Sequence, residues 1–118
     1  MSHVSHVTLE EFNQVVLGSP VPVLVDFYAD WCGPCRMLAP VLERLAAEFN
    51  GRARIVKVNV DTEPELAEHY SVEAIPTLLF VVDGEPIGRT AGMLPETALH
   101  QALTDLTGPA VPNRQRVG

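Results

Sequence analysis

The spacing of hydrophobic residues along the chain predicts strands and helices that alternate. Apolar residues recur every three or four positions in four segments, as they do on the buried face of a helix. Near-continuous or alternating runs rich in β-branched residues form four other segments, as expected of strands in a covered sheet. The expected helices cover residues 9–17, 32–49, 66–70 and 95–107, and the expected strands cover 21–28, 54–60, 76–82 and 86–91.

The order of these elements predicts the topology of the sheet. Strand–helix–strand units favour parallel pairing with right-handed crossovers. The turn residues Asp83-Gly84-Glu85 between the last two strands predict an antiparallel hairpin instead. With a short strand before the first helix, the expected fold is α/β: a central mixed sheet, mostly parallel with a C-terminal antiparallel hairpin, flanked by helices on both faces.

Local signals mark the ends of the helices. Thr8 and Glu11 have the spacing of a capping box, and Thr62-Glu63-Pro64-Glu65 repeats that start signal with a proline in the first turn. Pro40 lies inside the longest expected helix, where its missing N–H predicts a kink.

Length and composition bound the class of protein. The 118 residues and 47% hydrophobic content suit one compact domain, which we expect at residues 1–107, with residues 108–118 as a flexible tail. Eight basic and fifteen acidic residues give a formal charge of −7, which argues against nucleic acid or anionic lipid as a partner. No apolar run is long enough to cross a membrane, and the first residues lack the features of a secretory signal, so we expect a cytoplasmic protein.

The segment Trp31-Cys32-Gly33-Pro34-Cys35 is the most informative feature. It joins a buried strand to a long helix, so Cys32 lies where free N–H groups and the helix dipole favour a thiolate. Cys35 follows one turn later, within reach of a disulfide, and Pro34 stiffens the first turn without breaking a helical bond.

Three other interpretations of the cysteine pair are weaker. A zinc site needs a second ligand pair, whereas His69 and His100 stand alone. A c-type haem needs a histidine after the second cysteine, where Arg36 stands. Simple packing of two thiols suits this turn of Trp, Gly and Pro poorly. The context of strand, CxxC and helix therefore favours redox chemistry.

The chain resembles the thioredoxin family from about Thr8 to Leu106. The matching segments are Val25–Cys35, Lys57–Asp61, Ile75-Pro76-Thr77 and Asp83-Gly84. The resemblance implies a thioredoxin fold, with Cys32 as the exposed nucleophile and Cys35 as the buried resolving thiol. It also implies that Gly33, Pro34 and Lys57 tune the redox potential.

Asp26 interrupts a strand that should be buried on both faces. Loss of water there should raise the pKa of its carboxyl group, although on an edge strand it would be merely a partly solvated residue. The resemblance implies that Asp26 relays the proton of Cys35. It also implies that Lys57 approaches Asp26, although an outward-facing strand lysine is the commoner case.

The bond between Ile75 and Pro76 is expected to be trans on base rates alone. The resemblance implies a cis bond facing the cysteines, with the backbone of Ile75 free to pair with a substrate. An apolar substrate-binding surface around Cys32 is then expected, although scattered surface hydrophobes are common. Its residues would be Trp31, Ala74, Ile75, Pro76, Gly92 and Met93.

Two classes of function remain open from the sequence. The first is a general cytoplasmic protein-disulfide reductase, expected as a monomer with no bound cofactor or metal. By the resemblance, NADPH supplies its electrons through a flavin-dependent thioredoxin reductase, and its other partners are disulfide-containing client proteins. The alternative is a non-catalytic accessory or assembly subunit, and an oxidising relative is disfavoured by the expected compartment. Tyr28, where many relatives have tryptophan, and Arg36, which replaces a common lysine, depart from the family pattern.

Overall fold

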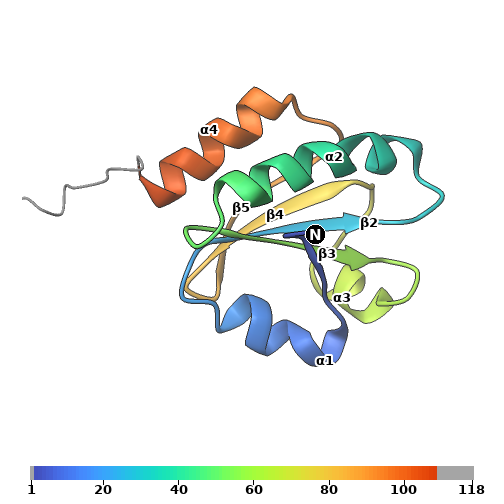
Figure 1. The fold of residues 1–118 in the computed structure, drawn as a ribbon. Helices are drawn as coiled ribbons and strands as arrows, with labels where there is room; N and C mark the ends of the chain where they lie inside the picture. Colours follow the sequence, from blue (N-terminus) through green and yellow to red (C-terminus); the bar gives the residue numbers. More distant parts are fainter. Residues whose placement is uncertain (1, 109–118) are drawn as a thin grey trace, which may run out of the picture.

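A five-stranded mixed sheet forms the centre of the computed structural model, which describes residues 2–108 (Figure 1). The strands lie in the order β1 (Ser5–His6), β3 (Arg54–Asn59), β2 (Val23–Tyr28), β4 (Thr77–Val82) and β5 (Glu85–Ala91). β1, β3 and β2 pair in parallel, whereas β4 is antiparallel to both β2 and β5. The expected mixed sheet and its C-terminal hairpin are confirmed.

Helices cover both faces of this sheet. α1 (Leu9–Phe12) continues as a wider π-helical segment, η1 (Asn13–Leu17), and with α3 (Pro64–His69) it lies on one face (Figure 1). α2 (Gly33–Glu48) and α4 (Glu96–Thr107) lie on the other face. Within residues 2–108, the longest helices fall short of the length and apolar character that crossing a bilayer requires.

One detail of the topology differs from the expected parallel crossovers. β4 enters the sheet at the same end where β3 leaves it, because Thr77 at the start of β4 pairs with Phe27 near the end of β2. The six residues of α3 span only about 9 Å, whereas a strand of six residues spans about 20 Å. α3 therefore does not carry the chain back along the sheet, and β4 runs antiparallel to β2.

The start of α3 also differs from the expected capping box. Glu63, and not Thr62, is the residue before its first turn. The side-chain oxygen of Asn59 accepts hydrogen bonds from the amides of Asp61 (2.8 Å) and Thr62 (3.4 Å). This local turn holds Thr62 outside the helix. At α1 the expected Glu11 bond is present, since its carboxylate accepts from the N–H of Thr8 at 3.0 Å.

The hydrophobic core lies on both faces of β2, whose six residues are all buried. Val23, Val25 and Phe27 pack toward α1 and α3, whereas Leu24 packs toward α2 and α4. Strand alternation places Asp26 on the same face as Leu24, beneath α2. The carboxyl group thus enters the sheet on the side where α2 begins.

The end of the domain follows the sequence signals. Gly108 ends α4 at a φ of 75°, and its N–H donates to the carbonyl of Thr104 at 2.7 Å. The tail expected from residue 108 onward lies, apart from Gly108 itself, outside the described residues.

Candidate active site

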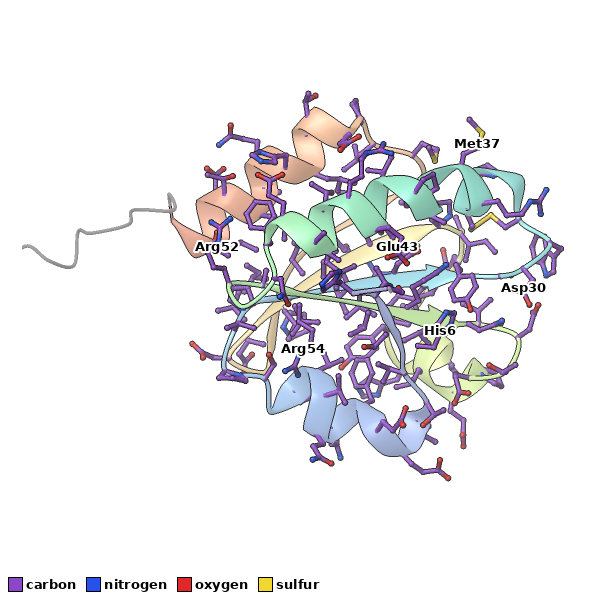
Figure 2. All side chains as sticks on the ribbon, viewed as in Figure 1. His6, Asp30, Met37, Glu43, Arg52 and Arg54 are labelled. Carbon is purple, nitrogen blue, oxygen red and sulfur yellow. A yellow bond between two sulfur atoms is a disulfide. The ribbon has the colours of Figure 1, made fainter. Side chains whose placement is uncertain are left out.

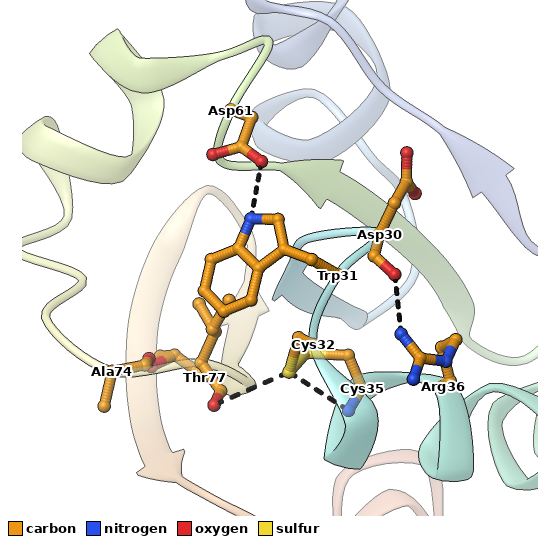
Figure 3. Close-up of a disulfide and its surroundings, with 9 residues drawn as sticks. Asp30, Trp31, Cys32, Cys35, Arg36, Asp61, Ala74 and Thr77 are labelled. Atoms are coloured by element: carbon orange, nitrogen blue, oxygen red, sulfur yellow. Dashed lines mark hydrogen bonds between the residues drawn. A yellow bond between two sulfur atoms is a disulfide. The ribbon is translucent and has the colours of Figure 1, made fainter.

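A disulfide joins Cys32 and Cys35 at the start of α2 (Figure 3). Cys32 is the N-cap residue, and Cys35 lies in the first turn with its Cα atom 5.2 Å from that of Cys32. The backbone N–H of Cys35 donates to Sγ of Cys32 at 3.2 Å. When the disulfide is reduced, the same N–H and the helix dipole favour a negative sulfur at Cys32.

Both cysteine residues are largely covered in this disulfide form. Cys32 is 5% exposed and Cys35 is 2% exposed, so the expectation of an exposed sulfur at Cys32 is wrong for the oxidised state. The reason is local packing: the pair forms a small buried cluster with Tyr28 and Ala29, against which Ile75 also packs. The carbonyl oxygen of Ile75 lies 3.9 Å from Sγ of Cys32 and closes one side of the bond.

Three hydrogen bonds hold the loop that precedes the cysteines. The guanidinium of Arg36 donates to the carbonyl of Asp30 at 2.9 Å, and the N–H of Cys32 donates to the carbonyl of Ala29 at 3.2 Å. The indole N–H of Trp31 donates to the carboxylate of Asp61 at 2.9 Å, while the residue as a whole is 67% exposed (Figure 3). Trp31 therefore presents an anchored apolar ring to solvent beside the disulfide.

The bond between Ile75 and Pro76 is cis, as the resemblance implied and against the trans bond expected on base rates. The N–H of Gly92 donates to the carbonyl of Pro76 at 2.7 Å, which brings the loop after β5 against this segment. In the segment before β4, Ala74 is exposed, Ile75 is half-buried and Pro76 is buried. In the loop after β5, Gly92 is half-buried and Met93 is exposed. The structure thus joins Ile75, Pro76 and Gly92 beside Cys32.

Asp26 is completely buried, and neither of its carboxylate oxygens has a hydrogen-bond partner among residues 2–108. Loss of hydration raises the pKa of this carboxyl group from 3.8 to about 7, and the positive charge of Lys57 limits the rise. The carboxyl group can therefore exchange a proton near neutral pH.

Lys57 lies on the same face of the sheet as Asp26, since the two residues are partners in the parallel ladder of β2 and β3. Its Nζ atom lies 4.2 Å from the centre of the Tyr28 ring. Within residues 2–108 no ion pair of 4.0 Å or less joins it to Asp26. The residues lining a surface pocket of about 340 Å³ include Tyr28, Cys35, Arg36 and Lys57.

Met37, which the sequence analysis did not single out, is a large apolar side chain that is 68% exposed on α2 (Figure 2). It lies one helical turn after Gly33, on the part of α2 nearest the disulfide. The buried face of α2 is formed by Cys35, Leu38, Leu42, Leu45 and Ala46. A large apolar residue outside that face was the signal that could have identified it.

Other parts of the described chain offer less chemistry. A larger hollow of about 480 Å³ lies between α1 and α3, lined by residues such as Leu9, Leu66 and Tyr70, and it contains no cysteine. Across residues 2–108, no three His, Cys, Asp or Glu side chains lie close enough together to hold a metal ion.

Comparisons of the sequence with known proteins point to one family. The thioredoxin family model matches residues 3–105. Thioredoxin 1 of Nostoc is 47% identical over 103 residues, which cover 87% of this chain and 96% of that protein. The thioredoxin of Haemophilus influenzae is 46% identical over 99 residues, covering 84% and 92%. The thioredoxin of Mycobacterium bovis is 47% identical over 107 residues, covering 91% and 89%.

Proposed function

This chain belongs to the thioredoxin family and is a thiol–disulfide oxidoreductase of the protein-disulfide reductase type, and we propose how its residues divide that work. The observation that carries the proposal is the Cys32–Cys35 disulfide at the start of α2, above a buried carboxyl group. No observation favours the alternative of a non-catalytic accessory subunit.

Cys32 is the proposed nucleophile. In the reduced protein its thiolate attacks one sulfur of a client disulfide, a mixed disulfide forms, and the other client sulfur leaves as a thiolate that takes a proton from solvent. The thiolate of Cys35 then attacks Sγ of Cys32, which releases the second client thiol and forms the intramolecular disulfide. Two electrons pass from the cysteine pair to the client.

Asp26 is the proposed proton acceptor for Cys35. Its burial beneath α2 and its pKa of about 7 support this role, because a carboxylate with that pKa can take the proton of a thiol in the neutral range. The pocket lined by Cys35 and Lys57 offers a route by which the proton reaches solvent. Three further residues are proposed to tune the redox potential: Lys57 on β3, and Gly33 and Pro34 between the two cysteines.

The surface around Cys32 is the proposed client-binding site. Trp31, Ala74 and Met93 are exposed there, and the carbonyl of Ile75 lies near Cys32. An extended client segment would pair with the backbone of Ile75, as in strand addition on a small scale, with Pro76 and Gly92 shaping the floor.

The electron source and the compartment are also proposals. We assign NADPH, acting through a flavin-dependent thioredoxin reductase, as the reductant, since such a protein works without a bound cofactor and needs an external partner to restore its dithiol. A dithiol that reduces client proteins is maintained most easily in a reducing compartment, which supports the cytoplasm.

The test is to trap the client intermediate. Cys35→Ser should accumulate mixed disulfides between Cys32 and client proteins that dithiothreitol releases, whereas Cys32→Ser, the matched control, should trap none. Wild-type protein should also turn over a protein disulfide with NADPH and a thioredoxin reductase. Absence of trapped clients together with absence of turnover would contradict the proposed function.

A further inference from the structure

Tyr28 occupies an unusual position between two charged or titratable neighbours. It lies at the end of β2, is 6% exposed, and carries the ammonium group of Lys57 over its ring at 4.2 Å from the ring centre. Its hydroxyl lies 3.0 Å from Nδ1 of His6. The three side chains come from three adjacent strands, β2, β3 and β1.

We propose that Tyr28 is a positioning residue for the redox reaction: its ring, braced by His6, holds the ammonium group of Lys57 at the pocket beside Cys35 and Asp26. The proposal rests on the role given above to Asp26. It assigns to Tyr28 the task of fixing where the neighbouring positive charge acts.

The physical argument begins with the lysine. Its flexible four-carbon stem lets the ammonium group reach solvent, where hydration is strong. The electron-rich face of an aromatic ring attracts a cation, more strongly where water is partly excluded. Lys57 is half-buried and lines the pocket together with Tyr28. Attraction to the ring therefore favours the position of the ammonium group at the pocket over a position in solvent.

The ring is itself held in place. The rings of His6 and Tyr28 meet edge to face, with centroids 5.8 Å apart. His6 is also the register partner of Lys57 in the ladder of β1 and β3, so its side chain lies on the same face of the sheet. Burial raises the pKa of Tyr28 above its ordinary value, so the hydroxyl keeps its proton and stays in hydrogen-bond contact with Nδ1 of His6.

The electrostatic consequence concerns Asp26. Lys57 favours the charged form of that carboxyl group, and the strength of this effect depends on how near the ammonium group stays. The other titratable or charged groups around the pocket are Tyr28 on β2, His6 on β1, Asp30 in the following loop, and Cys35 and Arg36 on α2. On β4 the residue paired with Asp26 is Leu78, and leucine carries no charge.

The test is a titration of the Asp26 carboxyl carbon by NMR in the disulfide form, where the cysteines do not titrate. Tyr28→Leu removes the ring and should shift the titration midpoint of Asp26 to higher pH, because the ammonium group moves away. Tyr28→Phe loses the hydroxyl but keeps the ring and its edge-to-face contact with His6, so its midpoint should stay near that of the wild type. Imidazole signals of His6 are recorded in parallel at each pH, as a control for effects of that ring on the carboxyl signal.

A double variant makes the test specific. In a Lys57→Met background, where no charge remains to be positioned, Tyr28→Leu should leave the midpoint of Asp26 unchanged. A midpoint that does not move or moves to lower pH in Tyr28→Leu alone would overturn the proposal, as would an equal shift in the Lys57→Met background. Because the titration measures charge and not turnover, its failure would leave the proposed reductase activity standing.

Discussion

Asp26 and Lys57 are partners in the parallel ladder between β2 and β3, yet no ion pair of 4.0 Å or less joins them within residues 2–108. A carboxyl group without a hydrogen-bond partner therefore lies near a positive charge that only partly compensates its burial. This arrangement keeps the proton affinity of Asp26 high while leaving it sensitive to the position of one lysine.

The stability of the fold should depend on pH through Asp26. The pKa of its carboxyl group is about 7 in the folded protein, against an ordinary value of 3.8 that applies to the unfolded chain. Between these two pH values the folded protein therefore binds one proton that the unfolded chain has lost. The resulting stabilisation is complete below pH 3.8 and is lost as the pH rises through about 7, up to about 4 kcal/mol in all. Asp26→Ala should therefore raise the free energy of unfolding, measured in guanidinium chloride, at pH 8 and not at pH 4.

A matched control for this prediction is Asp30→Ala. Asp30 is exposed in the loop after β2, so its removal should change the free energy of unfolding by less than about 0.5 kcal/mol at both pH values. A loss of stability in Asp26→Ala at pH 8 would contradict the buried carboxyl group as described.

The second chemical step should depend on the same carboxyl group. Release of the client from Cys32 should become faster as the pH rises through about 7, where Asp26 becomes able to accept the proton of Cys35. Asp26→Asn should slow this release by roughly tenfold or more and abolish that pH dependence. Rapid-quench measurement of the mixed disulfide separates this step from the first attack, which should keep its rate.

Met37 should contribute to client binding and not to stability. Met37→Ala should leave the free energy of unfolding within about 0.5 kcal/mol of the wild type, because the side chain is 68% exposed. It should raise KM for protein disulfides while leaving the reduction of a small aromatic disulfide unchanged. The neighbouring Leu38 is fully buried, and Leu38→Ala should instead cost about 2–5 kcal/mol in unfolding free energy. An unchanged KM in Met37→Ala would contradict a contribution of this residue to client binding.

The β4–β5 hairpin should tolerate substitution at the glycine within β5 but not at the glycine in its turn. Gly84 has a φ of +79°, and a Cβ atom there would lie 3.1 Å from the carbonyl oxygen of Leu17. Gly84→Ala should therefore lower the free energy of unfolding by at least about 1 kcal/mol. Gly88 in β5 has open space around it, so Gly88→Ala should cost less, as thermal unfolding of the two variants would show. Equal melting temperatures would argue against this turn geometry.

Periodicity and turn residues were sufficient to predict the elements and the hairpin. The run from Val21 to Tyr28 predicted a buried strand because covered strands need apolar residues on both faces, and the structure buries every residue of β2. Asp26 was recognisable within it because a carboxyl group in such a run cannot avoid desolvation. The antiparallel direction of β4 was not predictable in this way, because it follows from the short reach of α3 and not from any pattern in β4 itself.

Contacts between side chains that are distant in the chain could not be predicted from the sequence either. The bond from Trp31 to Asp61 and the approach of Lys57 to Tyr28 join residues about thirty positions apart in the chain. They depend on which strands become neighbours, and alternation along one strand gives only the face on which a side chain lies. The covering of Cys32 by Ile75 depends likewise on the loop between α3 and β4, which lies about forty positions further along the chain.

The exposed indole beside the disulfide has a practical consequence. Trp31 is the only tryptophan in the sequence and is adjacent to Cys32, so the intrinsic tryptophan fluorescence of this protein originates entirely at its reactive end. Changes of oxidation state and the arrival of a client can therefore be followed optically in the unlabelled wild-type chain, in real time and at low concentration.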